Sequence, residues 1–180
     1  VAQVTYPAGR LDGQGSGRIT RELPSRPREI YLTYEFARSA NATPHPVLHK
    51  LGYMHGTQNQ SGGSPFFWGL NEQGQLHVYL QADSGMPEPR PDRWYYPNRA
   101  NVTAPPGPFH RFELRAVAGR GTGELHVWLN GQKTHEDTGI NWTTDSLDAV
   151  NGDPIWGGNM GITVPQTFWL YFDNAYVSGR

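Results

Sequence analysis

The sequence has no cysteine and few charged residues. Without cysteine the chain can form no disulfide, no thiolate metal site and no cysteine nucleophile. Charged residues make up 17% of the 180 residues, and the formal net charge is −1 with no basic run. Nucleic-acid binding needs a basic patch, so we expect no nucleic-acid partner. No apolar stretch approaches the length of a membrane span, so we expect no membrane insertion.

Several catalytic signatures are also missing. The chain contains neither the Gly-x-Ser-x-Gly elbow of acyl-transfer hydrolases nor a phosphate-binding loop. Ordinary glycoside hydrolysis needs a pair of carboxylates, and the glutamates of this sequence are scattered. These absences argue against a hydrolase.

Helical periodicity is absent as well, and strand periodicity takes its place. No segment has apolar residues spaced by three and four over three turns. The chain holds 22 Gly and 15 Pro, the turn residues that all-β proteins need. About ten segments read as strands, with the clearest alternation of apolar and polar residues in 29–37, 75–81, 109–117 and 124–130. We predict an all-β fold, an antiparallel two-sheet β-sandwich of the jelly-roll kind, forming a single domain over 1–180.

Three local features refine this prediction. Asn130-Gly131 between two alternating segments predicts a tight hairpin. The alternation of the last strand shifts around Asp173-Asn174, which predicts a bulge. The segment from Asp145 to Val150 is expected to form a single helical turn.

The segment from Gly74 to Ala82 has an unusual polar face. Its apolar residues Leu76, Val78 and Leu80 predict one face in a core. The opposite face carries amide, imidazole and phenol groups, from Gln75, His77, Tyr79 and Gln81. These planar, directional and mostly uncharged groups suit the hydroxyls and flat faces of sugar rings. An outer face that only happens to lack charge is an equally good interpretation.

A long irregular stretch follows, from 83 to 108. Its prolines cannot donate to a sheet ladder, and a loop of this length in a compact domain is often functional. It carries arginine and aromatic side chains that could bind sugar: Arg90, Arg93, Trp94 and Tyr96. We include these four residues in the candidate binding site.

The same residue types would also serve an elimination reaction on a uronic acid. That reaction needs a cation or amide to neutralise the carboxylate, and a Tyr or His to move the proton. Lys50, His55, His77 and Tyr79 are the candidate catalytic residues for this chemistry. The alternative is that the face binds sugar without chemistry, which demands less precise geometry.

Aspartates in or near loops raise the question of a structural Ca²⁺ ion. Such a site needs several oxygen ligands from loops. The candidates are Asp12, Asp83, Asp92, Asp148, Asp153 and Asp173. Turn and cap roles are the competing interpretation, and no other metal or cofactor is predicted.

Five phrases of the sequence resemble a known family. They are Arg28-Glu-Ile-Tyr-Leu-Thr-Tyr-Glu-Phe36, His49-Lys-Leu-Gly52, Phe109-His-Arg-Phe-Glu-Leu114, Gly123-Glu-Leu-His-Val-Trp-Leu-Asn-Gly131 and Tyr171-Phe-Asp-Asn-Ala-Tyr-Val-Ser-Gly179. Together they resemble the concanavalin A-like jelly rolls of polysaccharide lyase and lectin-glucanase type. The resemblance implies two antiparallel sheets, of which a concave one forms a saccharide groove.

The resemblance also carries expectations for individual residues. It implies that Lys50 corresponds to the family's lysine in a Lys-Leu strand. Both Gly52-Tyr-Met-His-Gly56 and Gln75-Leu-His77 resemble the Gln-Ile-His strand of alginate lyases, and only one of them can be its counterpart. The closing motif with the catalytic tyrosine is not recognisable, and the arginine motif has a counterpart only in Arg18-Ile-Thr-Arg-Glu-Leu23.

Three functions remain open at this stage. The first is a secreted or cell-surface module that binds a polysaccharide, with acidic glycans among its candidate ligands. The second is a polysaccharide lyase that acts on a uronate-containing glycan. The third is a structural or adhesive surface protein that self-associates, because a jelly roll alone does not select among such functions.

Overall fold

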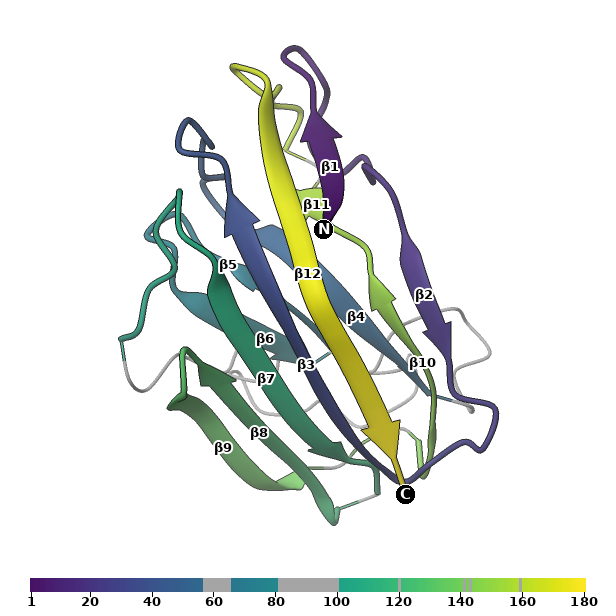
Figure 1. Ribbon diagram of the computed structural model, residues 1–180. Coiled ribbons are helices and arrows are strands. Elements are labelled where there is room, and N and C mark those ends of the chain that lie inside the picture. The colour runs from purple at the N-terminus through teal and green to yellow at the C-terminus, as the bar shows by residue number, and fades with distance from the viewer. Residues whose placement is uncertain (57–65, 81–100, 120, 141, 143, 159) are drawn as a thin grey trace.

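Two antiparallel sheets stacked face to face make up the protein (Figure 1). The computed structural model describes residues 1–56, 66–80, 101–119, 121–140, 142, 144–158 and 160–180. The first sheet contains, in spatial order, β1 (Ala2–Tyr6), β12 (Phe168–Gly179), β3 (Glu29–Arg38), β7 (His110–Val117), β8 (Gly123–Leu129) and β9 (Gln132–Ile140). The second contains β2 (Ile19–Glu22), β10 (Leu147–Gly152), β4 (His49–Gly56), β5 (Phe66–Leu70) and β6 (Leu76–Leu80), with β11 (Ile155–Trp156) paired to β4. These sheets confirm the predicted all-β sandwich of the jelly-roll kind.

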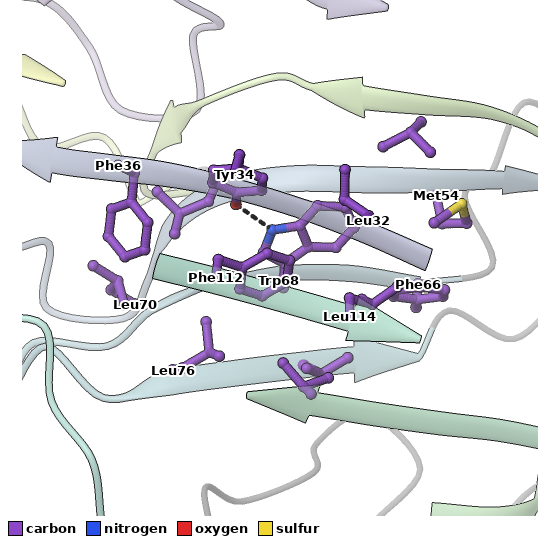
Figure 2. Packing of buried hydrophobic residues seen from close by; sticks show 14 of the residues in the cluster. Leu32, Tyr34, Phe36, Met54, Phe66, Trp68, Leu70, Leu76, Phe112 and Leu114 are labelled. Carbon is purple, nitrogen blue, oxygen red and sulfur yellow. Dashed lines mark hydrogen bonds between the residues drawn. The ribbon is translucent and has the colours of Figure 1, made fainter. Parts of the chain in front are cut away.

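The core lies between the two sheets because each strand sends alternate side chains inward. On β3, Tyr34 and Phe36 are buried with Ile30 and Leu32, as the alternation predicts. On β5 of the opposite sheet, Trp68 stacks on Phe112 with ring centroids 5.3 Å apart. Trp68 Nε1 also donates a hydrogen bond of 2.7 Å to the Tyr34 hydroxyl (Figure 2). One polar contact inside the core therefore joins β5 of the second sheet to β3 of the first.

Two of the predicted local features are confirmed. Asn130 and Gly131 have φ angles of 52° and 77°, the left-handed conformation that a two-residue hairpin between β8 and β9 requires. In β12 the register with β3 shifts between Asp173 and Tyr176, and Asn174 has a φ of 51°. The bulge predicted for the last strand is present.

The helical turn predicted for Asp145 to Val150 is wrong. Residues 147–150 of the segment lie in β10, which pairs with both β2 and β4. Leu147 and Val150 are both buried, and their spacing of three resembles a helix. A register shift between Leu147 and Ala149 adds one residue to the strand, and this bulge produces the spacing.

In the part of the chain that the structure describes, no helix is long and apolar enough to cross a bilayer.

Candidate functional site

The polar face predicted for β6 lies on the outer side of the second sheet. Leu76 and Val78 are fully buried in the core, so the alternate residues His77 and Tyr79 point to the opposite face, where His77 is still only 5% exposed. Phe67 of β5 lies directly opposite Tyr79, and Gly69 lies opposite His77. The outward side chains of β5 and β6 therefore form two neighbouring rows.

A bulge in β4 extends these rows to a third strand. The pairing of β4 with β5 shifts between Lys50 and Gly52, while Leu51 stays buried in the core. Before the shift Lys50 lies opposite Gly69, and after it Tyr53 lies opposite Phe67. One row thus reads Lys50, Gly69 and His77, and the next reads Tyr53, Phe67 and Tyr79.

Five of these side chains form what we call the ring cluster: Lys50, Tyr53, Phe67, His77 and Tyr79. Phe67 is at its centre, stacked on Tyr79 with centroids 4.9 Å apart and planes 6° apart. Tyr53 lies on the other side of Phe67, with ring centroids 5.5 Å apart, and the ring centroids of His77 and Tyr79 are 6.3 Å apart. The Lys50 Nζ atom is 5.4 Å from the centroid of Phe67, a cation–π contact. The cluster combines one cation, two phenols and one imidazole around an apolar ring.

Gly69 leaves the first row without a side chain between Lys50 and His77. A Cβ at this position would lie 2.5 Å from the His49 carbonyl oxygen and 2.9 Å from the Lys50 Cα. Both contacts are to backbone, so a larger residue would force the β4 bulge to move. No side chain therefore projects from β5 between the ammonium and the imidazole.

Burial sets the charge states of the cluster. Burial lowers the pKa of Lys50, and the carboxylate of Asp153 acts in the opposite direction. Burial raises the pKa of Tyr53, and the charge of Asp153 raises it further. Burial lowers the pKa of His77 to about 4. At neutral pH, Tyr53 is therefore a neutral phenol and His77 a neutral imidazole.

The turn between β5 and β6 fixes the orientation of His77. The Asn71 side-chain amide accepts a hydrogen bond of 2.8 Å from the Gln75 backbone N–H and donates one of 3.0 Å to the Gln75 side-chain oxygen. Asn71 Nδ2 also lies 3.1 Å from His77 Nε2. Since Nδ2 can only donate, Nε2 accepts and the proton of the neutral ring is on Nδ1. The same amide group of Asn71 uses Gln75 to hold the turn.

His55 lies further along β4 with a partner of its own. Its Nε2 atom is 2.6 Å from Nδ2 of Asn151, which comes from β10. Burial is the main reason that the pKa of His55 is lowered, and Asp148 acts in the opposite direction. The structure thus places His55 on the same sheet face as the ring cluster, next to Asn151.

Some site residues were predicted from the sequence and others were missed. Lys50, His77 and Tyr79 lie together in the ring cluster. The predicted Gln81, Arg90, Arg93, Trp94 and Tyr96 lie outside the described residues and stay predictions. Tyr53, Phe67, Asn71 and Asn151 were missed. The hairpin register could have found Phe67, since a turn over 71–74 places it opposite Tyr79.

The described aspartates have partners other than a metal. The described part of the chain holds no group of three His, Asp or Glu side chains able to bind a metal ion. Asp12 accepts hydrogen bonds from the backbone N–H groups of Met160 and Gly161, and Asp173 accepts one from Asn174. Asp83 and Asp92 lie outside the described residues, and the Ca²⁺ interpretation stays a prediction.

Comparison with known proteins yields matches in shape and none in sequence. No protein-family model matches the chain, and no curated protein sequence is similar enough to count as a match. The alginate lyase vAL-1 from Chlorella virus superposes with a TM-score of 0.75 at 15% identity, covering 99% of this chain and 84% of that one. The endo-β-1,4-glucuronan lyase from the fungus Trichoderma reesei gives 0.71 at 19% identity, with coverages of 99% and 79%.

A third similar structure comes from an animal. The marine PL-14 alginate lyase from Aplysia kurodai has a TM-score of 0.71 at 14% identity and covers 99% of this chain and 82% of that one. At these identities the likeness establishes the fold. The chain has the jelly-roll fold of the polysaccharide lyase type that the sequence resemblance implied.

Proposed function

We propose that the protein is a polysaccharide lyase that cleaves a uronate-containing glycan by β-elimination on the outer face of the second sheet. The observation that carries the proposal is the ring cluster, which gathers a lysine, two tyrosines and a histidine from three adjacent strands. The names of the similar structures support it, because they are alginate and glucuronan lyases. One of them, of TM-score 0.69, is a complex with an alginate tetrasaccharide.

The reaction makes three demands on the protein. A base removes the proton from C5 of the uronate, and the electron pair of that bond forms the C4–C5 double bond. The C4–O bond then breaks, and the glycosidic oxygen takes up a proton. Charge that develops on the carboxylate must be neutralised, because C5 is otherwise too weakly acidic.

Lys50 is the residue that we assign to the carboxylate. Its ammonium lies over Phe67, and its pairing partner on β5 is Gly69, which has no side chain. An ammonium at this position can pair with the carboxylate of a uronate and neutralise the charge that develops there.

Tyr79 is the residue that we assign to proton transfer. A phenol can take a proton as phenolate and return it to the leaving oxygen, so one group can serve both steps. The stacking of its ring on Phe67 fixes its direction. His77 is a weaker candidate for the base than the sequence suggested, because its Nε2 lone pair is occupied by Asn71.

The proposal is tested by incubation with alginate, glucuronan and heparin-type polymers, following the ultraviolet absorbance of the unsaturated product. Lys50→Ala should lower the rate about 100-fold or more, the usual effect of removing one charge-stabilising donor. Tyr79→Phe should do the same while the stacked ring is kept. Lys133→Ala is the matched control, since Lys133 pairs with Glu136 at 2.7 Å in the other sheet. If none of these polymers yields an unsaturated product, the proposal is overturned for those substrates.

A binding module without chemistry is the second candidate. The stacked Phe67 and Tyr79 favour it, because aromatic groups on a sheet are suited to sugar contacts whether or not a reaction follows. Affinity of the protein for an acidic glycan, with no ultraviolet absorbance from an unsaturated product, would identify this function. Self-association stays a prediction that light scattering would test.

A polymeric substrate also bears on where the protein acts. A polysaccharide cannot cross a membrane by itself, so we propose that the protein is secreted or exposed at the cell surface. Fractionation of the producing cells tests this, and recovery of the protein only from the cytosol would contradict it.

A further inference from the structure

The strongest feature outside the assigned residues is a buried carboxylate at the edge of β4. Asp153 lies in the short connection between β10 and β11, and both of these strands pair with β4. On one side of the connection Asn151 lies opposite Tyr53, and on the other Ile155 lies opposite Lys50. Asp153 is therefore placed beside the bulged part of β4, and it is only 7% exposed.

One exposed arginine holds this carboxylate. Arg18 Nε and Nη2 donate to the same oxygen, Oδ2, at 3.1 and 2.8 Å. The side chain of Arg18 is 62% exposed, while that of Asp153 is 10% exposed. The other oxygen, Oδ1, lies beside Gly15, where an added Cβ would be 3.4 Å away. A buried carboxylate is costly unless cations compensate it, and water screens the charge of an exposed arginine.

Lys50 is the second cation near this carboxylate, because its pairing partner Ile155 is two residues from Asp153. The charge of Asp153 counteracts the effect of burial on the pKa of Lys50. The same charge raises the pKa of Tyr53, while Arg18 lowers it. Asp153 and Arg18 thus act electrostatically on the ring cluster without belonging to it.

We propose that Asp153, clamped by Arg18, is a positioning residue that keeps the Lys50 side chain as an ammonium cation over Phe67. The Lys50 side chain projects from the bulged part of β4, and its ammonium group is partly buried. Phe67 supports the cation from the sheet side, and Asp153 supplies the opposite charge from the β10–β11 connection. The catalytic consequence rests on the proposed function, whereas the link between Asp153 and Lys50 does not.

Other groups surround Lys50 and must be considered with Asp153. On its own strand the titratable neighbours are His49, which is buried on the core side, Tyr53 and His55. On β5 the outward positions Phe67 and Gly69 do not titrate. Beyond these strands, the titratable and charged groups in the described part of the chain are His77 and Tyr79 of β6, Arg18 before β2, and the pair His45 and Asp12, whose side chains are 3.4 Å apart. Lys50 contributes to lowering the pKa of His45, whereas Asp153 is the group whose charge raises the pKa of Lys50.

The lysine content of the chain allows a direct test. Lys50 and Lys133 are its only lysines, and Lys133 lies on the first sheet. The acetylation rate of each lysine, measured by mass spectrometry over a range of pH, reports the fraction of free amine. In Asp153→Asn, Lys50 should react roughly threefold faster or more at a fixed alkaline pH, because an opposing charge has been removed. Lys133 should be unchanged and serves as the internal reference.

Two further variants make the test decisive. Arg18→Gln removes the cation that competes with Lys50 for Asp153. The acetylation rate of Lys50 should then fall, whereas it should rise in Asp153→Asn. Since Arg18 is exposed, this variant also provides a result if Asp153→Asn does not fold. Asp148→Asn on β10 removes a carboxylate of the same sheet that acts on His55, and it should leave Lys50 unchanged. Unchanged Lys50 reactivity in both the Asp153 and Arg18 variants, or shifts in the same direction, would overturn the inference.

The lyase assay separates this inference from the proposed function. If the protein is a lyase, the alkaline limb of its pH–rate profile should move to lower pH in Asp153→Asn, because Lys50 loses its charge earlier. A shift in acetylation without any lyase activity in the parent protein would support the inference and refute the function. If the parent protein is a lyase, and neither Asp153→Asn nor Arg18→Gln changes its pH profile or the acetylation rate of Lys50, the function is supported and the inference is refuted.

Discussion

The hydrogen bond between Trp68 and Tyr34 gives a quantitative prediction about the core. Tyr34→Phe removes the hydroxyl that accepts from Trp68 Nε1 at 2.7 Å and leaves the ring in place. Trp68 is 1% exposed and Tyr34 is 6% exposed, so water cannot replace the lost acceptor. The perturbation therefore leaves one indole N–H buried without a partner.

The expected cost follows from that burial. An average intramolecular hydrogen bond contributes about 1 kcal/mol, whereas a buried donor left unsatisfied costs about 1–3 kcal/mol. We therefore expect Tyr34→Phe to lower the free energy of unfolding by about 1–3 kcal/mol. Tyr176→Phe is the matched control, because Tyr176 is 59% exposed and surface substitutions usually change stability by less than about 0.5 kcal/mol.

Urea unfolding followed by tryptophan fluorescence measures the change. A double-mutant cycle adds the decisive comparison, because Trp68→Phe removes the donor. In that background, Tyr34→Phe should cost clearly less than it does in the parent chain. An equal cost in both backgrounds, or a cost no larger than that of Tyr176→Phe, would refute the reasoning.

Two further predictions concern the sheet that carries the site. Gly69→Ala should destabilise the protein by about 1–3 kcal/mol, since its Cβ would meet the β4 backbone at 2.5 Å, whereas Gly158→Ala has nothing within 4 Å and should be nearly neutral in the same urea titration. Burial lowers the pKa of His49 to about 3, from 6.5 in an unfolded chain. Between these values the unfolded chain binds a proton that the folded protein does not, so stability should fall as the pH drops from about 6.5 toward 3. His49→Gln should make this decline shallower, and an identical pH dependence in both proteins would contradict the assignment.

The sequence predicts those parts of the fold that depend on local alternation. The inward faces of β3 and β6 follow directly from apolar residues at every second position. The segment from Asp145 to Val150 shows where this reasoning fails. A bulge gives Leu147 and Val150 the spacing of a helix, and only pairing with β2 and β4 makes the segment a strand.

The candidate site also contains residues that follow from local alternation and residues that depend on strand pairing. Tyr79 and His77 could be predicted because they alternate with fully buried residues. Phe67 escaped prediction because its neighbours Phe66 and Trp68 are also aromatic, so no change of polarity marks its outward face. The place of Asp153 near Lys50 depends on the pairing of β4 with β10 and β11, which are far from it in the sequence. Local patterns carry no information about such a contact.

The ring cluster takes all its members from β4, β5 and β6, which follow one another along the chain. The opposite sheet contributes no side chain to it, only the support of the core beneath. If the protein has the function proposed above, changes in one continuous stretch of gene would alter its substrate preference, while the remaining strands keep the fold. Exchange of that stretch between two proteins of this shape would transfer the specificity of one to the scaffold of the other.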